Sequence, residues 1–193
     1  MPAAPSASPG IKGSVLRARV AYVRERGGES SVAKVFALLP ETDRAVLQGW
    51  ILNTSWYPLE LNLRLDDAIA QVLAPDDRKR AFLEMGRASA EVNLTGPHRH
   101  FIDPHDPHHL LSQSSVIYAA YYAIGRRTYE KTGQTSCVLR TFEAESVTET
   151  DCLTVIGWYV RAIERSGGKD VQVDEPVCRA RGGDHCEYRC RWS

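Results

Sequence analysis

The segment that most constrains the fold lies near the carboxyl end, where the sequence "DEPVCRARGGDHCEYRC" spans residues 174–190. Residues 170–181 and 186–192 have the composition of strands, and the Gly-Gly-Asp sequence between them favours a tight turn because glycine accepts positive φ. We therefore predict that the chain ends in an antiparallel hairpin. Since this hairpin also carries Cys178, Cys186 and Cys190, its sulfur chemistry is the first functional question.

The chain before the hairpin has a different pattern, with apolar residues recurring at helical spacing. Asp43 is a candidate N-cap for one of the expected helices. The predicted helices cover residues 15–26, 31–39, 44–52, 59–73, 78–92, 110–131 and 151–165. A further strand is predicted over residues 136–144, and a loop over residues 95–109, where prolines and histidines are frequent.

This order of elements predicts one α+β domain. A helical part would cover residues 11–132, and a strand–helix–hairpin part would cover residues 133–193, giving a single ligand-binding domain over residues 11–193. Residues 1–10, rich in proline, alanine and serine, are expected to form a disordered arm.

Composition narrows the possible partners and the compartment. Lysine plus arginine equals aspartate plus glutamate, 24 each, so no overall field attracts nucleic acid. The apolar runs, such as residues 116–124, are shorter than the ~20 residues that span a bilayer, and the amino terminus does not resemble a signal peptide. Five cysteines, an odd number, argue against a disulfide framework. We expect a cytoplasmic protein that binds neither nucleic acid nor membrane.

The cysteine-rich hairpin has three possible interpretations. Glu175, Cys178 and Cys186 would be neighbours on the hairpin, and Cys152 at the start of the preceding helix can add a fourth ligand, because a helix N-terminus favours a thiolate. Four such ligands suit tetrahedral zinc. Alternatively the cysteines are buried small hydrophobes, or two of them form a disulfide. The spacing leaves all three open.

A resemblance adds to this pattern. The stretch from Cys152 to Cys186, with "GWYVRAIERSGGKDVQVDEPVCRARGGDHC", resembles vinyl-reductase-type (4-vinyl reductase) domains, and is especially similar to the aromatic-sensing domains of phenol- and xylene-responsive activators. That resemblance implies a structural zinc held by Cys152, Glu175, Cys178 and Cys186. It also implies a homodimer, since the related sensors dimerise.

The first part of the chain has other resemblances. The stretch "IKGSVLRARVAYVRERGGESSVAKVFALLP" resembles the opening of haem-nitric-oxide-binding domains, which belong to the same ligand-binding superfamily. The Tyr-x-Ser-x-Arg motif with which those sensors hold haem propionates is absent from this sequence. The full chain, with "GWILNTSWYPLELNLRLDDAIA", "EMGRASAE" and "GPHR", also resembles a myxobacterial paralogous family of unassigned function.

Candidate ligand contacts come from aromatic residues that can line an apolar pocket. Tyr118 and Tyr122 share one face of a predicted helix, Trp158 lies on the helix that begins near Cys152, and Trp56 adds a further indole. His98, in "GPHR", can orient a polar group of a ligand. The common catalytic motifs, such as GxSxG, HExxH and the P-loop, are absent.

These features together predict a cytosolic, non-catalytic sensor for a small hydrophobic or aromatic ligand, braced by a structural zinc. Its signal would pass through an unknown output partner or a homodimer. Two alternatives are a haem- or tetrapyrrole-binding gas sensor and a ligand-free scaffold resembling vesicle-tethering subunits. A coloured protein would favour the first alternative, and a core without a pocket would favour the second.

Overall fold

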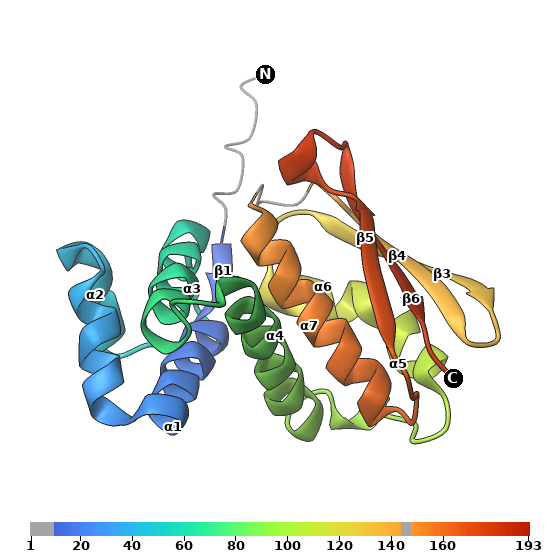
Figure 1. Ribbon diagram of the computed structural model, residues 1–193, viewed down its shortest axis with the longest axis horizontal. Helices are drawn as coiled ribbons and strands as arrows, with labels where there is room; N and C mark the ends of the chain where they lie inside the picture. Colours follow the sequence, from blue (N-terminus) through green and yellow to red (C-terminus); the bar gives the residue numbers. More distant parts are fainter. Residues whose placement is uncertain (1–9, 144–147) are drawn as a thin grey trace.

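The computed structural model describes residues 10–143 and 148–193, so the predicted amino-terminal arm lies outside the described residues except for Gly10. The first third of the chain forms a helical part around its own apolar core (Figure 1). Two short strands pair antiparallel within it. In chain order its elements are β1 (Gly10–Lys12), α1 (Gly13–Ala37), α2 (Glu41–Gln48), β2 (Trp56–Pro58) and α3 (Leu59–Leu73).

The boundaries of these helices follow local chemistry. Gly28 adopts φ 69°, which interrupts α1 at the point where the sequence predicts one helix to stop and another to begin. The prediction for α3 is confirmed at both ends. Asp43 was the wrong N-cap, because α2 begins at Glu41 and the Asp43 carboxylate instead pairs with Arg64, at 2.6 Å and 3.0 Å.

Two helices cross at the centre of the molecule, α4 (Arg78–Thr95) and α7 (Glu149–Arg165) (Figure 1). Glycines on both helices allow their backbones to approach closely. A Cβ at Gly86 would lie 2.0 Å from the carbonyl oxygen of Thr154, and a Cβ at Gly157 would lie 2.0 Å from that of Leu83. Any larger residue at either glycine would force the helices apart.

Between these helices the structure corrects one prediction, the long helix over residues 110–131. The chain instead forms the end of α5 (Pro107–Ser112), then α6 (Ser114–Tyr121) and the strand β3 (Arg126–Gly133). The predicted loop over residues 95–109 contains the short helix η1 (Arg99–Phe101) and the start of α5. Gly125, at φ 85°, turns the chain into β3 after the apolar run ends. The alternating "RRTYEKTG" pattern of β3 is typical of a strand with one covered face.

The rest of the chain forms a four-stranded antiparallel sheet in the order β3-β4-β6-β5. Its remaining strands are β4 (Ser136–Phe142), β5 (Gln172–Val177) and β6 (His185–Arg191), with η2 (Arg179–Arg181) before the turn into β6. The predicted hairpin and the α+β fold class are confirmed. Helix α7 packs on the sheet through Tyr159 and Ile163, and the Tyr159 ring lies 5.5 Å from the ring of Tyr188 on β6. No helix among the described residues is both long enough and apolar enough to span a membrane.

Candidate functional site

Three cysteines and one glutamate meet where α7 contacts the β5–β6 hairpin. Cys152 lies in the first turn of α7, Glu175 lies in β5, Cys178 follows β5 directly, and Cys186 lies in β6. The register of β5 on β6 shifts between Asp174 and Val177. Such an irregularity re-aims side chains, and here Glu175 and Cys178 both contribute to the same site. We call these four residues the thiol cluster.

The spacing of the ligand atoms in the thiol cluster matches a tetrahedral metal site. The Cys152 sulfur lies 3.7 Å from the sulfur of Cys178 and 3.7 Å from that of Cys186. Zn–S bonds of about 2.3 Å in a tetrahedron place sulfurs about 3.8 Å apart. One ligand atom from each of the four residues lies within 4.8 Å of all the others. The cysteines are free thiols, not a disulfide.

The environment of the thiol cluster favours a bound cation. The three cysteines are at most 7% exposed, and the buried Oε1 of Glu175 has no hydrogen-bond partner. A hydrogen bond from the Cys152 thiol lowers the pKa of Cys186 to about 6, and the same bond raises the pKa of Cys152. A cation would satisfy the carboxylate oxygen and hold all the thiols as thiolates. The four residues predicted from the sequence can therefore hold a metal ion.

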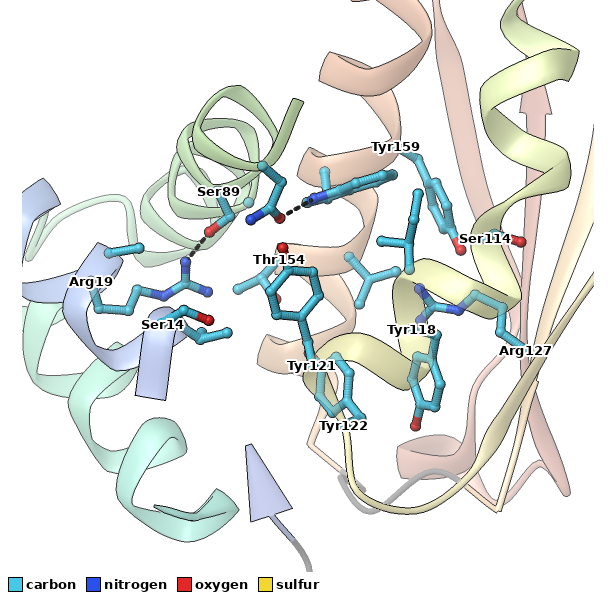
Figure 2. A pocket seen from close by; sticks show the side chains of 17 residues that line it. Ser14, Arg19, Ser89, Ser114, Tyr118, Tyr121, Tyr122, Arg127, Thr154 and Tyr159 are labelled. Atoms are coloured by element: carbon cyan, nitrogen blue, oxygen red, sulfur yellow. Dashed lines mark hydrogen bonds between the residues drawn. The ribbon is translucent and has the colours of Figure 1, made fainter. Parts of the chain in front are cut away.

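A second candidate site is a cavity of about 80 Å³ (Figure 2). Its walls come from α1, α4, α6, the start of β3 and α7. The thiol cluster does not contribute to it. Apolar walls include Val15, Ile117, Val155 and Trp158. The cavity is thus formed by segments that are far apart in the sequence.

The Arg127 guanidinium lies in the wall of this cavity (Figure 2). Its Cζ is 4.6 Å from the ring centroid of Tyr118 and 5.4 Å from that of Tyr159. Its Nε donates to the Oγ1 of Thr141 at 2.9 Å. Within residues 10–143 and 148–193, no carboxylate pairs with this guanidinium. Arg127 is therefore a positive charge held among aromatic rings.

A second arginine lines the opposite wall and is fully paired. The Arg19 guanidinium, 5% exposed, donates to Asp66 through Nε at 2.6 Å and through a second nitrogen at 3.2 Å. It also donates to the Ser89 hydroxyl and to the carbonyl of Met85. Asn62 donates to the same carboxylate at 3.3 Å. The charge of Arg19 is thus neutralised within the protein.

Two hydroxyl groups in the cavity wall are buried without a hydrogen-bond partner, those of Tyr159 and Ser114. Tyr159 is fully buried and Ser114 is 3% exposed. Burial raises the pKa of Tyr159, so its hydroxyl keeps its proton and remains a donor. Buried hydroxyls without partners are costly in a folded protein. These two groups make this side of the cavity wall polar, with no hydrogen-bond partner for either hydroxyl among the described residues.

The structure divides the ligand residues predicted from the sequence into two groups. Tyr118, Tyr122 and Trp158 line the cavity. Trp56 and His98 do not: Trp56 is 45% exposed beneath the Lys12 ammonium, 3.7 Å from its ring centroid. His98 packs behind the cavity wall, edge-on to Tyr121 at 5.6 Å, and burial lowers its pKa. Whether any of the five contacts a ligand stays a prediction.

The sequence interpretation did not single out four residues that now define the polar wall: Arg19, Arg127, Tyr159 and Ser114. Arg19 had a signal, because it interrupts the apolar face of α1 three residues after Leu16. Arg127 had a weaker one, the strand alternation that continues through Tyr129. Nothing in the sequence around Tyr159 and Ser114 marks them as site residues, and only the fold places both in the wall of the cavity.

The fold is similar to those of solved H-NOX domains. An H-NOX protein from S. oneidensis in the Fe(II)NO ligation state superposes with a TM-score of 0.71 at 14% identity, covering 94% of this chain and 99% of that chain. An unliganded Fe(II) H-NOX protein from K. algicida gives 0.66 at 13% identity, covering 94% and 96%. At these identities the likeness confirms the haem-nitric-oxide-binding resemblance for the fold alone. The resemblance to vinyl-reductase-type domains and to zinc-containing aromatic sensors stays a prediction.

The sequence comparisons carry less information about function. Residues 39–193 match the model of a family described as "Protein of unknown function (DUF2378)". No curated protein is significantly similar to the chain. The matched region includes the whole thiol cluster and every wall of the cavity except the part contributed by α1.

Proposed function

This chain belongs to the DUF2378 family, and we propose that it is a non-catalytic sensor module that binds a small molecule in the cavity of an H-NOX fold. The observation that carries the proposal is the cavity itself, which has apolar walls and two buried hydroxyls without partners. Concave sites with few, convergent polar groups are the usual form of small-molecule sites.

The size of the cavity limits its occupant. A volume of about 80 Å³ is less than the ~150 Å³ of an apolar cavity that holds benzene. The phenol-type ligands expected from the sequence therefore require a wall residue such as Tyr121 to move. A smaller ligand requires no rearrangement.

In this proposal the thiol cluster holds one structural zinc ion. Cys152, Glu175, Cys178 and Cys186 supply four protein ligands, and a closed set of four leaves no position for a reacting water. The 3.7 Å sulfur spacing and the unpartnered Glu175 oxygen support this assignment. The metal would fix the start of α7 to the hairpin. Since α7 also forms a wall of the cavity, the zinc would keep that wall rigid.

The output of the module would pass through a partner protein or a second copy of the chain. A ligand can shift only an equilibrium between states that it binds with different affinity. The cavity lies between helices α1 and α4 and the elements α6, α7 and β3. Its occupancy would therefore bias how these two groups of elements pack against each other. A homodimer would then transmit this change without any catalytic step.

The second candidate function is a haem-based gas sensor, which the neighbours favour over an aromatic-ligand sensor. One of them comes from a study of haem distortion in the H-NOX family, with a TM-score of 0.70 at 11% identity, covering 94% of this chain and 95% of that chain. The residues here do not fit haem. The cavity is well below the ~300 Å³ at which drug-sized pockets begin. Its lining contains no histidine, cysteine or methionine to serve as an axial ligand, and burial raises the pKa of Tyr121, Tyr122 and Tyr159, which disfavours the phenolate that a tyrosine ligand requires.

One preparation of the full chain tests the proposal and its alternative together. Elemental analysis should find one zinc per chain, and the visible spectrum should show no Soret band even when haem is supplied during expression. Thermal unfolding against a panel of small acids, amides, alcohols and phenols should show stabilisation by at least one class. If no compound raises the unfolding temperature, the sensor proposal fails. A stoichiometric Soret band would establish the haem alternative instead.

A further inference from the structure

The two arginines of the cavity differ in how their charges are compensated. Arg19 is matched by the Asp66 carboxylate through two hydrogen bonds. Arg127 has one hydrogen bond, donated by Nε to the neutral hydroxyl of Thr141, and no acidic partner among the described residues. A guanidinium has five N–H donors, and the four on its terminal nitrogens are left over. A charge that is half-buried in this way is stabilised when an anion neutralises it.

Two hydroxyl groups in the same cavity wall as Arg127 also have no hydrogen-bond partner among the described residues. The hydroxyls of Tyr159 and Ser114 have no partner, and both line the cavity with Arg127. In Figure 2 the Arg127 side chain and these two hydroxyls occupy the same side of the cavity. A ligand anion on this side would accept from the Arg127 guanidinium, with the two hydroxyls as nearby polar groups that have no partner among the described residues.

Resting on the sensor proposal, we propose that the ligand is a small carboxylate, bound with its anionic group on Arg127 and its short apolar tail against Ile117 and Trp158. The guanidinium matches a carboxylate in shape as well as in charge, because its terminal nitrogens donate in parallel. Acetate and propionate match the cavity volume of about 80 Å³.

This arrangement distinguishes a carboxylate from a neutral molecule of the same shape. The corresponding amide replaces one acceptor oxygen with an NH₂ donor, which would face the donors of Arg127. The corresponding alcohol has no charge to offer the guanidinium. A site built to hydrogen-bond a group rejects analogues that leave its buried polar groups unpaired.

The test is a titration of the full chain with propionate and with propionamide, at ionic strength held constant with chloride. Propionate should bind at least about tenfold more tightly, since hydrogen bonds to charged groups contribute about 1.5–3 kcal/mol and 1.4 kcal/mol is a factor of ten. Arg127→Met should lower propionate affinity by at least about tenfold, and Arg127→Lys by less. Arg126→Met, at the exposed neighbouring position on β3, is the matched control and should leave the affinity unchanged.

The possible failures are separable. Equal affinities for propionate and propionamide, or full affinity in folded Arg127→Met, would overturn the carboxylate assignment while the sensor proposal stands on any other compound that binds. If propionate fails to bind but a phenol or an alcohol does, the carboxylate assignment is again overturned and the sensor proposal stands. If nothing in the wider panel binds, the sensor proposal itself is refuted. Circular dichroism of each variant establishes that it is folded before its affinity is interpreted.

Discussion

The thiol cluster and the cavity lie at different parts of α7, and they are assembled in opposite ways. The cluster takes three of its four ligands from a single hairpin and the fourth from the first turn of α7. The cavity draws its walls from four helices and a strand, spread from Ser14 to Tyr159. The cluster is therefore a local feature with close atomic contacts, and the cavity is a consequence of how the two parts of the molecule pack.

This difference implies different sensitivities. The cluster concentrates its stability in a few bonds, so the loss of any ligand should be severe. Many residues line the cavity, and each would contribute a small part of the ligand-binding energy. A single substitution there should therefore lower ligand affinity moderately and leave the protein folded. Under the proposed function the division would be useful, because a bound metal would hold one end of α7 while the cavity responds to its ligand.

The largest effect is expected for Cys178→Ser. If the cluster holds zinc, the change removes one of four bonds that join α7 to the hairpin, and structural zinc contributes about 10 kcal/mol or more to folding. We expect mostly insoluble protein and, in any soluble fraction, less than half an equivalent of zinc. Soluble yield and elemental analysis measure both quantities.

The matched control for this change is Cys137→Ser. Cys137 is equally buried, at 1% exposure, and lies opposite Cys190 in the sheet, outside the cluster. Exchanging its thiol for a hydroxyl should cost only about 1–3 kcal/mol and leave the zinc content unchanged. Similar damage from both variants, with zinc retained in Cys178→Ser, would reduce the cluster to buried thiols.

A smaller effect is expected for Asp66→Asn, which removes the counter-charge of Arg19 in the cavity wall. The pair is almost fully buried, with Asp66 at 2% exposure. Breaking such a pair costs about 3–5 kcal/mol, because the remaining charge is left uncompensated. Urea unfolding should show this loss in the free energy of unfolding.

Asp67→Asn is the control on the same helix. Asp67 forms an exposed ion pair with Arg78, and exposed pairs contribute about 0–1 kcal/mol. The comparison also bears on Arg127, which has no counter-ion within residues 10–143 and 148–193, so Arg127→Met should destabilise the free protein less than Asp66→Asn does. Equal costs for Asp66→Asn and Asp67→Asn would show that the buried pair is not important for stability.

The hairpin half of the thiol cluster was predictable because its spacing is local, whereas the choice of all four residues as zinc ligands came from the resemblance to zinc-containing aromatic sensors. A hairpin turn with Cys178 and Cys186 on either side brings those residues together whatever the rest of the chain does. The cavity was not predictable, since residues 110–131 have the apolar spacing of one long helix. On such a helix Arg127 would have been one more surface charge. The break at Gly125, whose φ of 85° ends the helical run, is what moves Arg127 onto a strand facing α7.

The third prediction concerns the close crossing of α4 and α7. In Gly157→Ala the added methyl would lie 2.0 Å from the Leu83 carbonyl oxygen, so the helices must separate, at a cost of about 1–3 kcal/mol. Both helices line the cavity, whereas α4 contributes nothing to the thiol cluster. We therefore expect weaker ligand binding with full zinc content. Gly182→Ala strains the backbone, because Gly182 has φ 87°, but its added methyl meets nothing within 4 Å and lies outside the cavity wall, so ligand affinity should stay unchanged.

The smallest effect is expected for Trp158, which is compared with Trp56 because the sequence predicts both as ligand contacts. Trp158 lines the cavity and its indole N–H donates to the Oδ1 of Asn93 at 3.1 Å, which holds the ring in place. In Trp158→Phe that hydrogen bond is lost and the ring is no longer held in the cavity wall, so we expect a loss of propionate affinity no larger than about tenfold. Trp56→Phe changes a ring that lies away from the cavity beneath Lys12, so propionate affinity should not change. The dissociation constants of both variants, measured side by side, decide whether the cavity or the wider aromatic surface binds the ligand. An equal loss in both would contradict the cavity assignment, because no contact of Trp56 reaches the propionate position proposed here.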